Sequence, residues 1–521
     1  MNNQDKRINS ARQNLWICLA AALAIGMLSH GYALFQDSFS HDSLNAFFSN
    51  SEETIWMISL GRFLAPVYRA VFRGQIALPW VIGVTSMVWL GLSGYLIARL
   101  MNVRSNLSVL LILAILITNE TITTWTGTYI FLLDVVAFGI LLAVLAVWFW
   151  RNGKGMFMIL PGIPLVAASL ALYQSNVSVT ITLIMMLSIL DLLDGGSVVS
   201  VAKKGIFGVL MILGGGVVYY VSNEAVMDLT GVAASVSDNS LNQALMSGMS
   251  LFERLKTTFF YVKYEYLSPI TFWDWNIPMA ALLLLGGLVA AISAVVLFRQ
   301  KAAGAFVARI GLCGVLVCLL PLGMNTATFL QGMNHDLMNF SVWFVYLLAV
   351  VILERYLDSM PVPGKKAISC VGAALVLVTM WNNIVVANTL YMKKDLEKEG
   401  SIAMMTRVMG RLEAMEAYVP GETEVCFIGS RDLTGVTMQG FEKYAAMTGA
   451  WTSGPITGIV EENHFNTYED FFRYYLNEPV QLCDAEFKDR MEEDPRVREM
   501  KAFPSRECIQ VIDGVVVVKM G

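Results

Sequence analysis

Charge is scarce in this chain, and several familiar motifs are missing. Only 15% of its 521 residues are charged, against about 25% in a typical soluble protein. No run of Lys and Arg suits a nucleic acid. We find no P-loop, no GxGxxG turn, no Gly-x-Ser-x-Gly elbow and no zinc pattern. These absences argue against an ATP-driven pump and against a cytosolic nucleotide-sugar enzyme.

Cysteine supplies no disulfide framework. Four of the cysteines lie in apolar runs and are best explained as small buried hydrophobic side chains. The other three, Cys426, Cys483 and Cys508, lie in the polar C-terminal part. Three cysteines allow one disulfide in an oxidising space, and the sequence does not choose the pair.

Long apolar runs dominate what is present. Hydrophobic residues make up 56% of the chain and gather in runs near the length that crosses a bilayer core of about 30 Å. We therefore predict a polytopic α-helical membrane protein with about 11 transmembrane helices. They span roughly residues 14–35, 77–99, 106–119, 129–150, 156–173, 176–193, 205–223, 277–298, 306–323, 337–354 and 367–388.

Lys and Arg near the span ends predict the orientation. With the N-terminus inside, every alternate short connection carries basic residues, as in Arg99 with Arg104 and Arg151 with Lys154. The opposite connections 120–128, 174–175 and 324–336 carry none. This pattern predicts a multi-pass protein of a bacterial-type cytoplasmic membrane, with its C-terminus outside.

Two domains follow from this topology. Residues 1–388 form the transmembrane domain, with a first outer loop at 36–76 and a second large outer segment at 224–276. Residues 389–521 form a small extracytoplasmic α/β domain, beginning with a charged helix at 393–416. Asp513-Gly514 between two β-branched runs predicts a terminal hairpin.

The first outer loop holds two carboxylates and an imidazole, Asp37, Asp42 and His41, directly after the first span. A carboxylate within hydrogen-bond reach of an acceptor hydroxyl can act as a general base. The plainer interpretation is a loop in which Asp42 caps the next helix and His41 only lies at the interface.

Arg62 and Arg69 follow in the same loop, on a predicted amphipathic surface helix over residues 54–73. The arginine fork donates two parallel hydrogen bonds and suits phosphate. Seven residues make two helical turns, so both side chains would face one way. The alternative is a surface helix whose two arginines extend to lipid headgroups. Acids beside cations at a lipid surface suit a reaction on a lipid-linked phosphate substrate.

Further polar residues are expected at the same outer mouth. A carboxylate inside an apolar span is costly and is a functional candidate by default, although a pairing with arginine purely for folding explains it equally. The other candidates lie in polar breaks between spans, where a wet loop is the plainer explanation. The candidates are Asp134, Tyr129, Tyr173, Gln174, His335 and Asp336.

Several of these segments resemble the Gtr type-II membrane glucosyltransferases. The similar segments are residues 30–42, Leu60-Gly61-Arg62-Phe63-Leu64, residues 129–134, Leu172-Tyr173-Gln174 and the terminal hairpin. The resemblance implies a GT-C fold with the catalytic carboxylate in the first outer loop. It also implies transfer of glucose from undecaprenyl-phosphate-glucose to an O-antigen or another surface polysaccharide.

Carried over to this chain, the resemblance makes Asp37 the preferred base and Asp42 the second choice, with Arg62 holding the lipid phosphate. Relatives often have adjacent acids where this chain has Asp37-Ser38, which leaves the choice of base open. The expected partners are a polyprenyl-phosphate-sugar donor, a polysaccharide acceptor and the bilayer, with no nucleic acid. The sequence requires no cofactor and leaves a divalent cation open.

Three alternatives remain at this stage. One is a non-catalytic envelope assembly protein, for which the C-terminal domain would be the working part. Another GT-C enzyme that moves a different lipid-linked sugar would have the same residues at its mouth. A transporter or flippase for lipid-linked sugars would instead need charges deep in several spans and related halves. We find no such internal repeat in the sequence.

Overall fold

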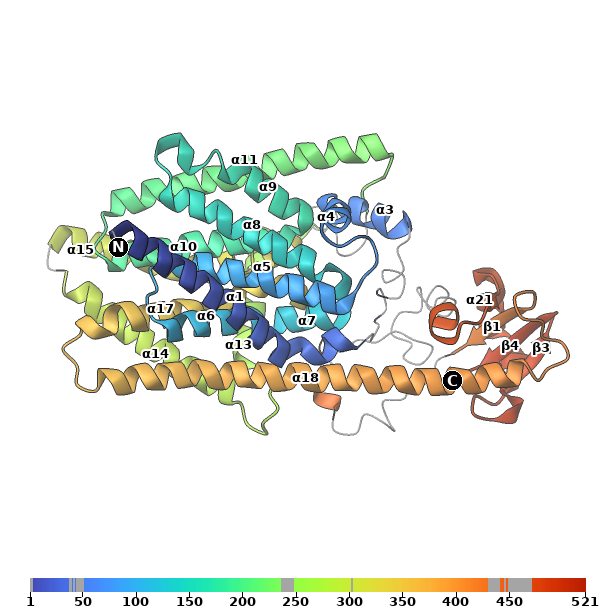
Figure 1. Ribbon diagram of the computed structural model, residues 1–521. Helices are drawn as coiled ribbons and strands as arrows, with labels where there is room; N and C mark the ends of the chain where they lie inside the picture. The colour runs from blue at the N-terminus through green and yellow to red at the C-terminus, as the bar shows by residue number, and fades with distance from the viewer. Residues whose placement is uncertain are drawn as a thin grey trace.

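The protein is a bundle of long helices joined to a small β-sheet (Figure 1). The structure, a computed structural model, describes residues 3–36, 40, 43, 51–235, 248–300, 303–429, 441–444, 447 and 471–521. In that part, ten helices are long and apolar enough to cross a membrane, or eleven if one bent pair counts as a span. This number agrees with the count predicted from the apolar runs.

The first half of the chain is a succession of helices, with short 3₁₀ turns written η. In order they are α1 (Asn3–Phe35), α3 (Ser51–Ser59), α4 (Leu64–Phe72), α5 (Pro79–Leu100), α6 (Asn106–Thr118), α7 (Glu120–Thr128), η1 (Ile130–Leu132), α8 (Leu133–Asn152), η2 (Gly155–Met158), α9 (Gly162–Leu172), η3 (Gln174–Asn176), α10 (Val177–Leu193) and α11 (Val198–Thr230).

The second half continues the bundle and ends in the sheet. Its helices are α13 (Leu251–Leu267), α14 (Ile277–Phe298), α15 (Ala303–Met324), α16 (Thr326–Gln331), η4 (Asp336–Met338), η5 (Phe340–Trp343), α17 (Phe344–Tyr356), η6 (Leu357–Ser359) and α18 (Lys365–Leu412). The remaining elements are β1 (Glu424–Ile428), η7 (Glu442–Tyr444), the π-helical turn η10 (Phe472–Leu476), β2 (Gln481–Leu482), α21 (Ala485–Glu493), α22 (Pro495–Glu499), η11 (Arg506–Cys508), β3 (Ile509–Ile512) and β4 (Val515–Lys519).

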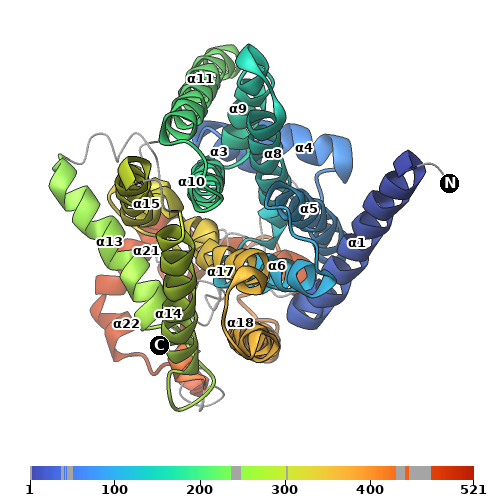
Figure 2. The ribbon, with the colours of Figure 1, turned by 90° about the vertical axis from the view of Figure 1, so that its left-hand side faces the viewer.

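Helices α1, α5, α8, α9 and α11 follow one another in an arc, each packed on the next (Figure 2). Small residues allow the close approach of α1 and α5: a Cβ added to Gly83 would lie 2.4 Å from the Leu34 side chain, and one added to Gly91 would lie 3.0 Å from Cβ of Ala22. Close contact of this kind drives helix association where lipid is as apolar as the side chains. Helices α8, α10 and α17 are the most buried spans and form the centre of the bundle.

The third predicted span is a bent pair. Helices α6 and α7 meet at Asn119 with a bend of 42°. The Asn119 side chain accepts a hydrogen bond from the backbone N–H of Ile122 and so caps α7. This bend directs α7 into the polar end of the bundle.

The predicted surface helix over residues 54–73 is wrong as one continuous element, because α3 and α4 are separated at Gly61. Gly61 has φ +77°, and its N–H donates to Ile58 O while Arg62 N–H donates to Met57 O. These two bonds form a Schellman motif, which ends a helix. Arg62 therefore lies in the break and not on the same helical face as Arg69.

The predicted boundary at residue 388 falls inside α18. This helix has 48 residues and would be about 72 Å long at 1.5 Å per residue. The chain becomes polar after Asn388 but contains no Pro or Gly until Gly400, so polarity changes without breaking the helix. The last span and the predicted charged helix are one element.

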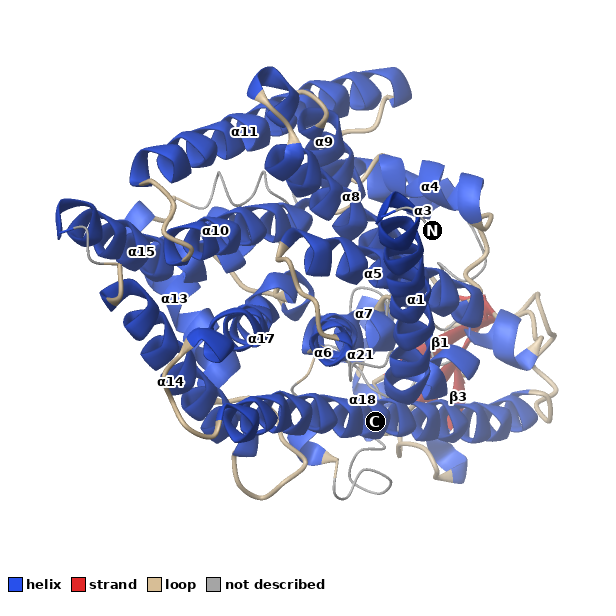
Figure 3. Cartoon of the chain, turned by 60° about the vertical axis from the view of Figure 1, so that its left-hand side comes forward, coloured by secondary structure: helices blue, strands red, loops and turns tan. Residues whose placement is uncertain are grey.

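The C-terminal strands form a four-stranded sheet in the order β2-β1-β4-β3, beyond the end of the bundle where α3 and α4 lie (Figures 1 and 3). Strand β1 is parallel to β2 and β4, and β3 and β4 form the predicted hairpin. Asp513 and Gly514 both have positive φ, as a type I′ turn requires. One face of the sheet packs on the end of α18, and α21 and α22 cover the other face.

Candidate functional site

Polar side chains from distant parts of the chain meet at the end of the bundle that faces the sheet, which we call the mouth end. It contains residues 60–73, 119–134, 173–174 and 335–339. Hydrogen bonds join these segments: Gln174 Nε2 donates to Leu60 O at 2.6 Å, and Thr121 Oγ1 donates to Asp336 O at 2.9 Å. The predicted candidates therefore come together, although they lie far apart in the sequence.

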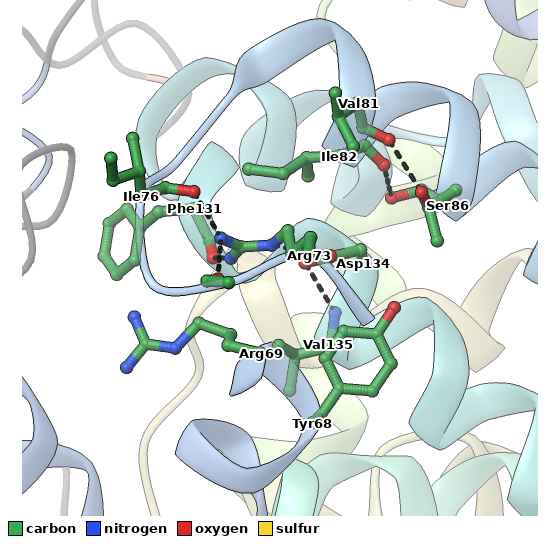
Figure 4. A network of polar contacts seen from close by, with 12 residues as sticks. Tyr68, Arg69, Arg73, Ile76, Val81, Ile82, Ser86, Phe131, Asp134 and Val135 are labelled. Carbon is green, nitrogen blue, oxygen red and sulfur yellow. Dashed lines mark hydrogen bonds and ion pairs between the residues drawn. The ribbon is translucent and has the colours of Figure 1, made fainter. Parts of the chain in front are cut away.

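Asp134 is held by a residue that the sequence analysis did not select. Arg73 Nε lies 2.8 Å from Asp134 Oδ2, and both side chains are almost fully buried. The Arg73 guanidinium also donates to Phe131 O and Ile76 O, and Asp134 Oδ1 accepts from Val135 N–H (Figure 4). A buried pair with all its partners in place is a structural anchor, which joins the C-terminal end of α4 to the start of α8.

Arg69 differs from Arg73. Its side chain is only 1% exposed, and Nη1 donates to both carboxylate oxygens of Glu53 at 2.6 Å. Its Nε and Nη2 are buried and have no hydrogen-bond partner among the described residues. Figure 4 shows this guanidinium pointing away from the Arg73–Asp134 pair. Unpaired buried donors are costly, which makes the free Nε and Nη2 of Arg69 candidates for binding an anion.

Arg62 lies in the break between α3 and α4, with its guanidinium carbon 4.9 Å from the centre of the Tyr173 ring. Its Nε is also buried without a partner in the described structure. The break itself is fixed, because Tyr219 Oη donates to Gly61 O at 3.1 Å. A Cβ added to Gly61 would lie 2.4 Å from Tyr219 Oη, so glycine is needed here for both space and φ.

An aromatic cluster lies next to Arg62. The Trp125 ring meets Tyr173 edge to face at 4.9 Å and Tyr129 at 5.8 Å. Trp125 was not predicted as a site residue, and its Nε1–H has no hydrogen-bond partner among the described residues. Flat aromatic faces beside polar donors suit a sugar ring, which has both C–H faces and hydroxyl edges.

His335 and Asp336 lie at the start of η4. His335 Nδ1 accepts from Leu337 N–H and so caps this turn.

Glu265 of α13 was not among the predicted site residues, and the negative charge of Asp336 influences its pKa. Burial, followed by the charge of Asp336, raises the pKa of Glu265 to about 7. Asn339 Nδ2 donates to Glu265 Oε1 at 2.6 Å. Glu265 can therefore exchange a proton near neutral pH.

Among the residues that the structure describes, no group of three His, Cys, Asp or Glu side chains could hold a metal ion. Asp134 is hydrogen-bonded to Arg73, and Glu265 is hydrogen-bonded to Asn339.

Asp37, His41 and Asp42 lie outside the described residues. Ser40, which stands between them in the sequence, is described, and its Oγ donates to Thr128 O at the end of α7. The adjacent carbonyl, Gly127 O, accepts from Lys394 Nζ. Lys394 is a buried cation of α18 that the sequence analysis also missed. The first loop is thus anchored at Ser40 beside Tyr129.

These features describe a multi-pass membrane protein with a polar candidate site at one end of a helical bundle. The model of the family Glucosyl transferase GtrII matches residues 31–353, and the chain belongs to that family. It is therefore a membrane glucosyltransferase, as the resemblance predicted. The match ends before α18 and the terminal hairpin. No curated protein and no solved structure matches the chain.

Proposed function

We propose that this enzyme transfers glucose from undecaprenyl-phosphate-glucose to an O-antigen or another envelope polysaccharide at the outer face of the cytoplasmic membrane. The observation that carries the proposal is a pair of arginines, the half-buried Arg62 and the buried Arg69, each with buried N–H donors that no described residue accepts. A phosphate diester of a lipid supplies the anionic oxygens that such donors need.

The position of the two arginines supports a lipid-linked donor. Both lie at or next to α4, an amphipathic helix with exposed Val67 and Val71 at the edge of the bundle. A polyprenyl chain can remain in the bilayer while its phosphate reaches the arginines. The aromatic cluster around Trp125 then offers a surface for the glucose ring.

The proposed reaction is a single displacement. An acceptor hydroxyl attacks the anomeric carbon, and the bond from that carbon to the phosphate oxygen breaks. The electron pair leaves with the lipid phosphate, where the arginines stabilise the growing negative charge. A carboxylate takes the hydroxyl proton, and the anomeric configuration is inverted. Asp37 is our first choice for this base and Asp42 our second.

The architecture we propose for this reaction is a GT-C fold with the N-terminus inside and residues 389–521 as an outer domain. In the described part of the chain, the ends of α8, α10 and α17 that lie opposite the mouth end carry Arg151, Asp191 and Arg355. Basic residues gathered at that end support its assignment to the cytoplasm.

The test is glucose transfer in membranes supplied with undecaprenyl-phosphate-glucose and native envelope acceptor. We would compare wild type with Asp37→Asn, Asp42→Asn and Glu265→Gln at matched protein levels. The control is Arg309→Gln near the start of α15, at the opposite end, where Arg309 donates to Gly196 O and Gln300 Oε1. Loss of transfer in Asp37→Asn alone identifies the base. Equal transfer by wild type and all three carboxyl variants would contradict the proposed mechanism. A wild type without transfer would contradict the proposed donor or acceptor.

A further inference from the structure

The C-terminal sheet places two of the three polar-region cysteines side by side. Cys426 is the third residue of β1, and Cys483 directly follows β2. These strands pair in parallel with Val425 opposite Leu482, and Cys483 N–H donates to Val425 O at 3.1 Å. Continuing this register by one residue puts Cys483 opposite Cys426.

The spacing of this pair suits a covalent link. Neighbouring strands lie about 4.8 Å apart, within the Cα–Cα range of about 4.4–6.8 Å that disulfides adopt. Both side chains point to the same face of the sheet and belong to one buried cluster with Phe487, Met491 and Val497. The two thiols interact directly, with the S–H of Cys426 donating to the sulfur of Cys483.

The third cysteine cannot take part. Cys508 belongs to the core on the other face of the sheet, where it packs with the end of α18. Its Sγ lies 3.4 Å from Arg411 Nη1. The sheet therefore separates Cys508 from the other two and decides a choice that the sequence left open.

We infer that Cys426 and Cys483 form a disulfide in the working enzyme, introduced by an extracytoplasmic protein disulfide oxidant. This inference depends on the outer location of residues 389–521 that belongs to the proposed function. Disulfides persist in that kind of compartment and are rare in the cytosol.

The chemistry assigns different tasks to the two thiols. The hydrogen bond from Cys426 lowers the pKa of Cys483, which makes Cys483 the better nucleophile. Cys483 is 3% exposed and borders an open pocket of about 700 Å³ lined by Arg473, Asn477 and Glu478, whereas Cys426 is 0% exposed and does not line this pocket. Cys483 is therefore the nearer of the two thiols to an approaching reagent.

The disulfide forms by two successive thiol–disulfide exchange steps. The Cys483 thiolate attacks the disulfide of the oxidant and forms a mixed disulfide, releasing one thiol of the oxidant. Cys426 then loses its proton and attacks Cys483 Sγ, releasing the second thiol. The two cysteines are oxidised, and the oxidant disulfide is reduced to a dithiol.

Such a link would strengthen a weak edge of the sheet. Strand β2 has only two residues and pairs with β1 through two positions. A disulfide beside it also closes the long segment between Cys426 and Cys483, which restricts the unfolded chain. We expect reductant to lower the thermal midpoint of the wild type by several degrees and to leave that of the Cys426→Ala/Cys483→Ala double variant unchanged.

The test counts thiols in the full-length protein taken directly from cells. Thiols are trapped in acid, the chain is denatured and tagged with a maleimide of added mass, with and without prior reduction. We expect two fewer tags on the unreduced wild type, and a linked peptide pair containing Cys426 and Cys483 after proteolysis. Cys508→Ser should keep this difference of two tags, whereas Cys426→Ser should abolish it.

A fusion of alkaline phosphatase to the C-terminus reports the side of the membrane independently. Phosphatase activity together with free thiols at both positions would overturn the disulfide and leave the proposed function intact. An inactive phosphatase in a stably expressed fusion would overturn the proposed orientation and the disulfide together.

Discussion

The two ends of the helical bundle use arginine in different ways. At the end opposite the mouth, Arg151 donates through both terminal nitrogens to Asp191 at 2.6 Å. Arg355 there pairs with Asp194. At the mouth end, Arg69 and Arg62 keep buried donors that no described residue accepts. Ion pairs occur at both ends, but in the described part of the chain Arg69 and Arg62 at the mouth end also have N–H donors without an acceptor.

Arg73 refines this comparison, because it belongs to the mouth end and is nevertheless fully paired. Arg69 and Arg73 are four residues apart on one side of the same short helix, α4, and its C-cap. The two arginines are neighbours on the same helical segment, but Arg69 pairs with Glu53 and Arg73 pairs with Asp134. The difference between Arg73 and Arg69, which we propose to bind phosphate, therefore lies in the acceptors that the fold places around each guanidinium.

The largest effect is expected from breaking the Arg73–Asp134 pair. Asp134→Ala leaves a buried, unpaired guanidinium, which typically costs about 3–5 kcal/mol. We expect the thermal midpoint of the purified protein to fall steeply. The double variant Arg73→Met/Asp134→Leu should recover most of the loss. Activity lost without any loss of stability would show that Asp134 acts on the substrate.

The next effect should come from Arg69. Arg69→Gln removes the donors proposed for the lipid phosphate, and removing one such donor typically costs about 10²–10³ in rate. Arg69→Lys should recover only part of the rate, because an ammonium lacks the planar fork. The measurement is glucose transfer at matched expression, with Arg309→Gln as the control. Unchanged glucose transfer in Arg69→Gln would show that Arg69 does not bind the lipid phosphate, and the proposed functional difference between the two ends would be wrong.

A smaller effect concerns Glu265 and pH. Because the folded pKa is about 7 and the ordinary value is 4.5, the folded protein holds a proton that the unfolded chain releases between these values. This contribution to stability is complete below pH 4.5 and is lost as pH rises towards 7. Glu265→Gln should flatten this part of the curve of thermal midpoint against pH. If wild type and Glu265→Gln had the same slope between pH 4.5 and 7, the pH dependence of stability would come from another titratable group.

The smallest effect is expected at the end of the bundle opposite the mouth end. Lys204 Nζ lies 3.4 Å from Asp191 and is 38% exposed, whereas Arg151 already satisfies that carboxylate. Such exposed pairs contribute about 0–1 kcal/mol. We expect Lys204→Ala to leave transfer and thermal stability nearly unchanged. A large loss of transfer would give that end a functional role of its own.

Local signals in the sequence predicted the spans and the terminal hairpin. The length of an apolar run is a property of the run itself, and it led to the helices that the structure describes. Asp513-Gly514 needs only its own backbone angles to form the hairpin. Gly61 was also a local signal, and taking it as a helix end would have placed the break between α3 and α4 correctly.

The pairings at the mouth end could not be predicted in this way. Arg73 and Asp134 are 61 residues apart, and the contact between Ser40 and Thr128 spans 88 residues. Glu265 lies in the segment predicted only as a large outer segment, and Lys394 lies in the stretch predicted only as a charged helix. Their burial depends on what packs against them, which a single sequence does not state.

The unbroken length of α18 has a mechanical consequence. Since the helix carries the chain from the bundle to the sheet without a hinge among its 48 residues, it fixes both the height and the heading of the sheet above the mouth. Removing one residue beyond the bundle would turn the sheet by about 100° and bring it about 1.5 Å closer to the bundle, whereas removing seven would nearly restore its direction about 10 Å closer to the bundle. The length of this helix therefore determines both the distance and the rotation of the sheet relative to the mouth end.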